Sequence, residues 1–125
     1  MKTVLIAEDS SVIQNLAKRV LEFSDYKIKL AKNGKEVLDI LAKETFDLII
    51  LDIIMPVMDG MECMRKIRTL EGNANQHIPV VAISGNARNY SAQEFADAGF
   101  TAFLAKPLDY DKLMETVNTL TAVEQ

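Results

Sequence analysis

Asp52 follows an unbroken apolar run, and this position gives its carboxylate a defined place in a folded domain. Residues 48–51 read Leu-Ile-Ile-Leu, the pattern of a strand that is buried on both faces. Because a carboxylate is costly to desolvate in a core, we expect Asp52 where this strand emerges at the carboxyl edge of a sheet. Pro56 then stops the strand, and Gly60 permits a tight turn into a helix.

Four other polar side chains follow apolar segments of the same kind. They are Glu8, Asp9, Ser84 and Lys106. Each has an ordinary explanation as a helix cap, a turn residue or a solvated charge, and Asp52 alone could simply cap a turn. All five, however, are expected at one edge of a parallel sheet. Five unrelated polar residues are a poor explanation for such a grouping, so we expect a common function.

Three carboxylates beside one ammonium group carry a formal charge of about −2, which is unfavourable at close range unless a cation lies among them. Mg²⁺ suits this set of oxygen ligands better than Ca²⁺, which needs more oxygens, or Zn²⁺, which prefers His and Cys. The Ser84 hydroxyl and the Lys106 ammonium are the groups needed to hold oxygens of a phosphoryl group on Asp52. The pattern predicts a phosphoryl-transfer site.

Short apolar segments alternate with amphipathic ones along the whole chain. We expect strands at residues 3–7, 26–31, 48–51, 79–83 and 101–104. Apolar residues at helical spacing follow each of these strands, which predicts five helices. Strict alternation with short connections indicates right-handed crossovers and a parallel sheet.

Local signals mark the ends of some of these helices. The third helix is expected to extend through Leu70 and to end at Gly72. Ser91 and Glu94 have the spacing of a capping box at the start of the fourth helix, and Gly99 closes that helix.

The predicted fold is α/β, a doubly wound five-stranded parallel sheet flanked by five helices in a three-layer sandwich. For five strands we adopt the commonest order, 2-1-3-4-5. The 125 residues, 49% of them hydrophobic and 26% charged, fit a single domain over residues 1–125.

Composition excludes several classes of function. The net charge of −4 argues against binding to nucleic acid or to an anionic membrane, so we expect proteins and cations as partners. The single cysteine, Cys63, excludes an internal disulfide and a multi-cysteine zinc site. No apolar stretch is long enough to span a bilayer, and Glu8 and Asp9 interrupt the first apolar run, so a cytoplasmic location is expected.

Taken together, the motifs resemble the receiver domain of two-component response regulators, of the single-domain CheY type. The resemblance runs from Lys2 to about Thr121. It rests on the pair Glu8-Asp9, the run 51–60 (Leu-Asp-Ile-Ile-Met-Pro-Val-Met-Asp-Gly), Ser84-Gly85 and Lys106-Pro107.

This resemblance implies a role for each matching residue. Asp52 would accept a phosphoryl group from a sensor histidine kinase or from a histidine phosphotransfer protein. Mg²⁺ would be held by Glu8, Asp9, Asp52 and the backbone carbonyl of Ile54, and Lys106 would take the role of the family's lysine.

The resemblance also implies two residues that change position on phosphorylation and two residues at the rim of the site. Ser84 and Phe103 would be the switch residues, although Phe103 lacks the hydroxyl of the tyrosine that is frequent there. Ile54 and Asn86 would rim the site and control how water reaches the phosphoryl group, and the apolar Ile54 suggests altered turnover. A downstream protein would bind the face formed by the fourth helix, fifth strand and fifth helix. We expect a monomer that could dimerise when phosphorylated.

Three other classes of protein share some of these features. A flavodoxin would bind a flavin phosphate after the first strand, where Glu8 and Asp9 would repel it. A phosphohydrolase with an aspartate nucleophile usually has a second acid two residues on, where this chain has Ile54. We therefore expect that the protein is not an enzyme and catalyses only its own phosphorylation and dephosphorylation. A receiver taken from a hybrid kinase or a longer regulator remains an alternative.

Overall fold

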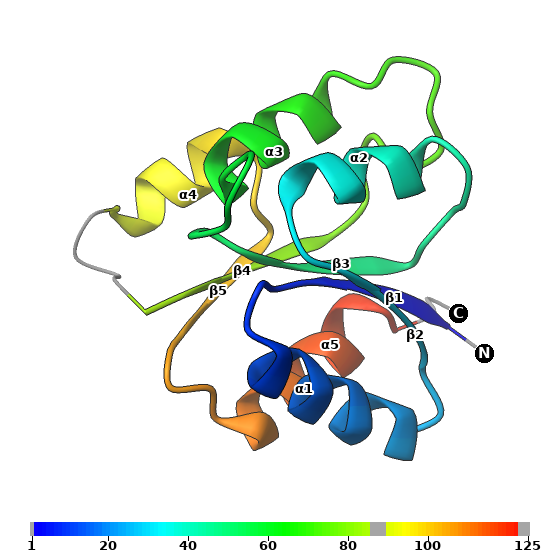
Figure 1. The fold of residues 1–125 in the computed structure, drawn as a ribbon, viewed down its shortest axis with the longest axis vertical. Coiled ribbons are helices and arrows are strands. Elements are labelled where there is room, and N and C mark those ends of the chain that lie inside the picture. The colour runs from blue at the N-terminus through cyan, green and yellow to red at the C-terminus, as the bar shows by residue number, and fades with distance from the viewer. Residues whose placement is uncertain (1, 86–89, 123–125) are drawn as a thin grey trace.

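A computed structural model describes residues 2–85 and 90–122, in which five strands alternate with five helices (Figure 1). The strands are β1 (Thr3–Ala7), β2 (Lys27–Ala31), β3 (Leu48–Asp52), β4 (Val80–Ser84) and β5 (Ala102–Ala105). The helices are α1 (Ser11–Phe23), α2 (Gly34–Leu41), α3 (Gly60–Arg68), α4 (Ala92–Ala98) and α5 (Tyr110–Leu120). Across these described residues, no helix has the length and apolar character to cross a bilayer.

All five strands are parallel and lie in the order β2-β1-β3-β4-β5. The predicted fold class and strand order are thus confirmed. The register places Asp52 opposite Ile83 and Ser84 opposite Ala105. The carboxyl ends of four neighbouring strands, β1, β3, β4 and β5, therefore meet along one edge of the sheet.

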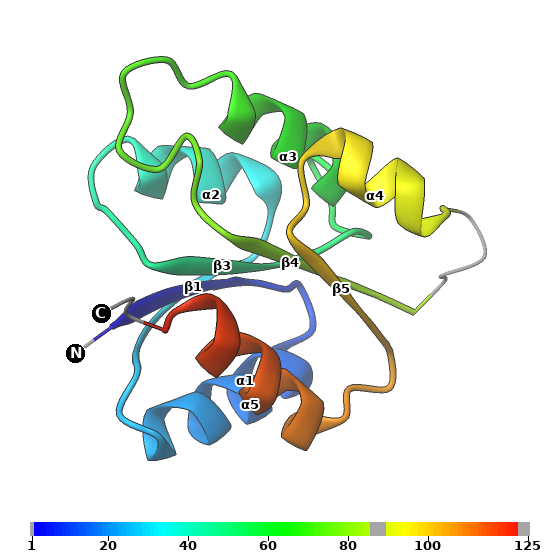
Figure 2. The same cartoon turned by 180° about the vertical axis from the view of Figure 1, so that it is seen from behind.

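Helices cover both faces of this sheet. Helices α2, α3 and α4 lie on one face, and α1 and α5 lie on the other (Figures 1 and 2). Successive side chains of β3 point to opposite faces, so Ile49 and Leu51 pack toward α2 and α3, whereas Ile50 packs toward α1 and α5. Every residue of β3 and of β4 is buried, which gives the site a rigid support.

Polar side chains begin the helices as N-caps. Each accepts a hydrogen bond from a backbone N–H of the first turn, which satisfies a donor that the helix itself leaves unpaired. The caps are Ser10, Asn33, Asp59, Ser91 and Asp109. The predicted capping box of α4 is confirmed, with Ser91 and Glu94 bonded reciprocally, and Gly99 closes that helix in the left-handed conformation.

The third helix ends earlier than predicted. It stops at Arg68, and Gly72 lies in the turn beyond it with a φ of 75°, so the prediction that Gly72 closes the helix is wrong. The Thr69 hydroxyl donates to the Lys66 carbonyl at 2.9 Å, and the Leu70 N–H bonds a carbonyl three residues back. These contacts tighten the last turn and take up carbonyls that a longer helix would use.

Candidate functional site

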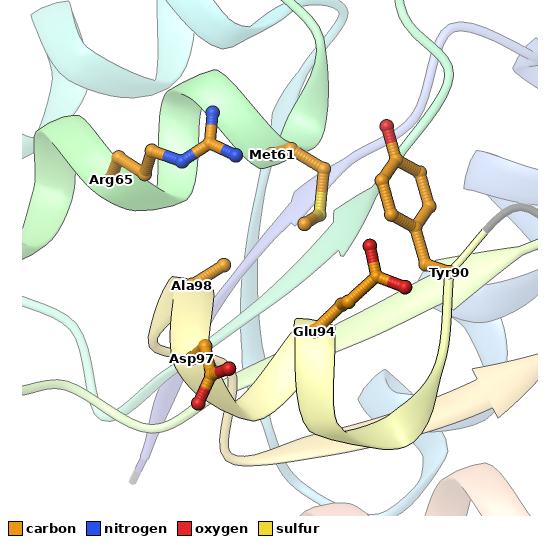
Figure 3. A pocket seen from close by; sticks show the side chains of 6 residues that line it. All are labelled: Met61, Arg65, Tyr90, Glu94, Asp97 and Ala98. Carbon is orange, nitrogen blue, oxygen red and sulfur yellow. The ribbon is translucent and has the colours of Figure 1, made fainter.

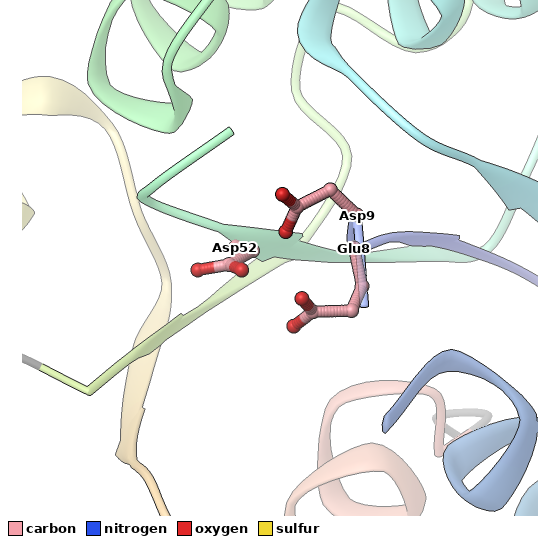
Figure 4. A group of neighbouring side chains, drawn as sticks. All are labelled: Glu8, Asp9 and Asp52. Carbon is pink, nitrogen blue, oxygen red and sulfur yellow. The ribbon is translucent and has the colours of Figure 1, made fainter. Parts of the chain in front are cut away.

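Three carboxylates meet at the carboxyl edge of the sheet. Glu8 and Asp9 directly follow β1, and Asp52 is the last residue of the neighbouring strand β3. One oxygen from each lies within 4.8 Å of the other two (Figure 4). Glu8 and Asp52 are each 1% exposed, whereas Asp9 is open to solvent. Topology alone brings these residues together, because β1 and β3 are far apart in sequence.

Lys106 lies against two of these carboxylates. Its Nζ donates to Asp52 Oδ2 at 3.0 Å and forms an ion pair with Glu8 Oε2, also at 3.0 Å. The Lys106 N–H donates to the Ser84 carbonyl at 2.9 Å, which fixes the lysine at the end of β5. Burial lowers the pKa of Lys106, but its hydrogen bond to Asp52 and the charges of Asp52 and Glu8 outweigh burial and raise it. The side chain therefore stays cationic.

The two oxygens of the Glu8 carboxylate have different surroundings. Its Oε1 accepts the Ser10 N–H at 3.0 Å, whereas the buried Oε2 accepts no hydrogen bond from any described residue. The 3.0 Å contact of Oε2 with Lys106 is an ion pair without hydrogen-bond alignment. Burial first, and then the neighbouring Asp52, raise the pKa of Glu8 from 4.5 to about 7. An oxygen-binding cation would remove this unfavourable arrangement.

The loop after β3 closes tightly over the strand end. The Ile54 N–H donates to Asp52 Oδ1 at 3.2 Å, so both carboxylate oxygens of Asp52 have a partner. The Gly60 N–H donates to the Ile53 carbonyl at 2.8 Å. A Cβ on Gly60 would lie 2.7 Å from Ile53 Cα and closer still to the Asp52 carbonyl oxygen. Gly60 is thus required by close approach of the backbone, not by a special φ angle.

The remaining predicted residues occupy different surroundings. Ser84 ends β4 at the same edge and is 2% exposed. Ile54, two residues after Asp52, is 62% exposed. Phe103 is half-buried on β5 and stacks on Phe95 of α4, with ring centroids 4.7 Å apart. Asn86 lies outside the described residues.

Sequence reasoning missed Gln14, which supports the site from α1. This side chain is 5% exposed, and its Nε2 donates to the Glu8 carbonyl at 3.2 Å and to the Ala31 carbonyl at 3.0 Å. It therefore ties the end of β1 to the end of β2. The available signal was an amide on the same helical face as the buried Ala17, where an apolar residue would be usual.

Comparison with known proteins identifies the class of protein that has this fold and site. The model of the response regulator receiver domain family matches residues 4–118. The chain therefore belongs to the response regulator receiver domain family.

Relatives of very different length contain this domain. The chain is 34% identical over 121 residues to hybrid signal transduction histidine kinase I of Dictyostelium discoideum, an alignment that covers 93% of this chain and 7% of that protein. It is 29% identical over 118 residues to the polar-differentiation response regulator DivK of Brucella anthropi, covering 94% of each. The chain thus spans a small part of the hybrid kinase and nearly all of the regulator.

Solved structures of receivers have the same architecture. The receiver domain of a Pseudomonas aeruginosa sensor histidine kinase, with a magnesium ion coordinated in its active-site cleft, superposes with a TM-score of 0.87 at 25% identity, covering 98% of both chains. TrrA of Thermotoga maritima in complex with Mg²⁺-BeF superposes with a TM-score of 0.84 at 28% identity, covering 96% of this chain and 99% of TrrA. CheY4 of Vibrio cholerae superposes with a TM-score of 0.86 at 29% identity, covering 96% of this chain and 98% of CheY4. The CheY-like resemblance is confirmed.

Proposed function

We propose that Asp52 is the phosphoryl acceptor of this receiver domain. The observation that carries this assignment is a buried Asp52 carboxylate bonded to Lys106 and within 4.8 Å of two further carboxylates. In the transfer, the bond between phosphorus and the donor's histidine nitrogen breaks and a bond to an Asp52 oxygen forms. The donor is a sensor histidine kinase or a histidine phosphotransfer protein, in keeping with the hybrid kinases among the relatives.

The same residues fit Mg²⁺. Glu8, Asp9 and Asp52 offer oxygen donors, and the buried Glu8 Oε2 lacks a hydrogen bond from the described residues. The family pattern adds the backbone carbonyl of Ile54. When bound, the ion would neutralise negative charge on the phosphoryl oxygens. The magnesium ion in the Pseudomonas receiver supports this assignment.

Two side chains of this protein would hold the phosphoryl group itself. Lys106 is already cationic and bonded to Asp52, so it would contact an oxygen of the incoming group as the bond forms. Ser84 would donate its hydroxyl to another oxygen. Catalysis would be limited to the domain's own phosphorylation and dephosphorylation, because exposed Ile54 stands where a phosphohydrolase would have its second acid.

The output would be a contact with another protein. Phe103 borders an apolar cavity of about 190 Å³ between α4 and β5, which gives its ring space to move inward when Ser84 approaches the phosphoryl group. The downstream target would bind the face formed by α4, β5 and α5. We propose a single receiver domain that is a monomer and that can dimerise when phosphorylated.

Mass measurement tests the acceptor. Wild type, Asp52→Asn and a control, Asp39→Asn in an exposed position on α2, are incubated with a small phosphodonor with and without Mg²⁺. Wild type and Asp39→Asn should gain one phosphoryl group only with Mg²⁺, and Asp52→Asn should gain none. Lys106→Ala should react on the order of a hundredfold more slowly, since it loses the charge that stabilises the transition state. Equal mass gain in Asp52→Asn and wild type would refute the assignment.

A further inference from the structure

The side chain of Arg68, the last residue of α3, joins this helix to the C-terminal end of α4. Its Nε and Nη2 donate to the Gly99 carbonyl at 3.1 and 2.7 Å. Its Nη1 donates to the Gln76 carbonyl at 3.0 Å, and the Gln76 amide donates back to the Arg68 carbonyl, also at 3.0 Å. The guanidinium therefore bridges two segments that follow α3 and α4.

This contact is closely fitted. Gly99 has a φ of 109°, and a Cβ at this position would lie 2.8 Å from Arg68 Cγ, so the arginine stem occupies the space beside it. Within residues 2–85 and 90–122, Arg68 forms no ion pair with a carboxylate; its hydrogen-bond partners are backbone carbonyls. A cation at carbonyls that end a helix is favourable electrostatically. Burial lowers the pKa of Arg68, as expected of a partly desolvated guanidinium.

The rest of α4 is separated from α3 by a groove of about 230 Å³. Met61 and Arg65 line it from α3, and Glu94, Asp97 and Ala98 line it from α4, with Tyr90 at one end (Figure 3). Unlike that of Arg68, the side chain of Arg65 forms no hydrogen bond or ion pair with another described residue. The apolar cavity beside Phe103 lies between α4 and β5. Helix α4 is thus hydrogen-bonded to α3 at its C-terminal end, and a groove toward α3 and a cavity toward β5 border the rest of it, although Phe95 is buried.

We propose that Arg68 is a positioning residue that fixes the C-terminal end of α4, so that phosphorylation makes this helix pivot about Gly99. This rests on the proposed function. The displacement then grows toward Ser91, the end of α4 nearer to Ser84 in the chain. Phe95 lies between the two ends and stacks on Phe103, so a pivot changes the packing of that ring. An α4 free at both ends would instead shift as a whole.

Hydrogen exchange on the unphosphorylated protein tests the anchor without relying on phosphorylation. Arg68→Ala should speed exchange of the α4 amides and of Phe100 by roughly tenfold, the effect of losing hydrogen bonds from a charged group. Arg68→Lys, which supplies one point charge in place of a planar fork, should give an intermediate increase. The matched control, Arg65→Ala, should leave these rates within about twofold. Equal exchange in Arg68→Ala and Arg65→Ala would overturn the anchor.

Amide chemical shifts with Mg²⁺ and beryllofluoride test the pivot. In wild type and in Arg65→Ala, changes should be large from Ser91 to Phe95 and small from Gly99 to Thr101. In Arg68→Lys and Arg68→Ala, they should extend through Gly99 while the changes at Asp52 are retained. Wild-type changes at Gly99 as large as those at Ser91 would overturn the pivot alone. No change at Asp52 would overturn the proposed function and the pivot with it, leaving the exchange result on the anchor intact.

Discussion

At the scale of single residues, the site depends on how one lysine is shared between two buried acids. Lys106 contacts both Asp52 and Glu8 at 3.0 Å, yet Glu8 keeps one buried oxygen without a hydrogen bond from the described residues. A buried carboxylate in this position is stable when protonated or when bound to a cation. A proton and a metal ion should therefore compete for the Glu8 carboxylate.

The raised pKa of Glu8 predicts how stability depends on pH without metal. Between pH 4.5 and about 7 the folded protein binds more protons at Glu8 than the unfolded chain does. The free energy of unfolding should therefore fall as the pH rises through this range, by about 3 kcal/mol at most from this residue. Glu8→Gln should remove this fall, and saturating Mg²⁺ should offset it in wild type.

Urea unfolding at pH 5 and pH 8 in chelator measures this effect. Glu44→Gln is the control, since Glu44 is exposed and pairs with Lys29 on the surface. That variant should keep the pH dependence of wild type. A fall in stability of Glu8→Gln between the two pH values as large as that of wild type would contradict the prediction.

The rim of the site should set how long the phosphoryl group lasts. Ile54 lies two residues after the proposed acceptor Asp52, is 62% exposed and has no side-chain group that could hydrogen-bond an attacking water. Ile54→Asn should speed decay roughly fivefold, the effect of one ordinary hydrogen bond of about 1 kcal/mol. Asn86→Ala should slow decay, because its amide would otherwise orient water. Decay is measured at one Mg²⁺ concentration; an Ile54→Asn protein with the wild-type lifetime would show that this residue does not control water.

At the scale of elements, the turn from β3 into α3 holds Asp52 in place. Asp59 caps α3, and the Gly60 N–H bonds the Ile53 carbonyl one residue after Asp52. The same turn packs on α2, since a Cβ on Gly34 would lie 2.8 Å from the Met58 carbonyl oxygen. The position of Asp52 therefore depends on two helices as well as on its own strand.

Two glycine substitutions separate backbone approach from backbone conformation. Gly60→Ala places a methyl group against the backbone of Asp52 and Ile53 and should cost roughly 3 kcal/mol of stability. It should also weaken Mg²⁺ binding, because the turn must move. Gly72→Ala meets nothing within 4 Å and has only an unfavourable φ of 75°, so it should cost about 1 kcal/mol. Denaturant unfolding measures the stability of each variant, and Mg²⁺ titration measures its affinity for the ion. If Gly60→Ala and Gly72→Ala lost the same stability and the same affinity, this account would be contradicted.

At the scale of the whole molecule, the sheet connects two separate cores through one edge. One core lies between the sheet and α2, α3 and α4, and the other between the sheet and α1 and α5. The site residues come from the ends of four neighbouring strands, so a ligand bound there contacts the middle of the sheet and not one face alone. Binding should therefore stabilise the domain as a unit.

Mg²⁺ with beryllofluoride should raise the melting temperature of the whole domain. At a hundredfold excess over Kd, binding to the folded state alone adds about 2.7 kcal/mol, which corresponds to roughly 10 °C for a domain of this size. Asp52→Asn should lose the beryllofluoride effect. Calorimetry with Mg²⁺ alone and with both ligands makes the comparison, and an equal shift in Asp52→Asn and wild type would argue against binding at Asp52.

Much of this fold follows from local patterns in the chain. The alternation of apolar runs and amphipathic segments predicts five parallel strands and five helices, and the capping box of α4 was predicted from Ser91 and Glu94. The position of Glu8, Asp9 and Asp52 at the sheet edge also follows, because a polar residue that ends a buried strand must lie there. These features depend on periodicity and desolvation, which neighbouring residues in the sequence determine.

Only the tertiary structure decided which distant groups pair. The double contact of Lys106 with Asp52 and Glu8, the support of Glu8 by Gln14, and the bond from Arg68 to Gly99 all join residues from different elements. The early end of α3 has a related cause, since the Gln76 amide, from the loop that follows, takes up the backbone carbonyl of Arg68. Such contacts depend on strand order and on the exact approach of helices, and no local periodicity encodes those distances.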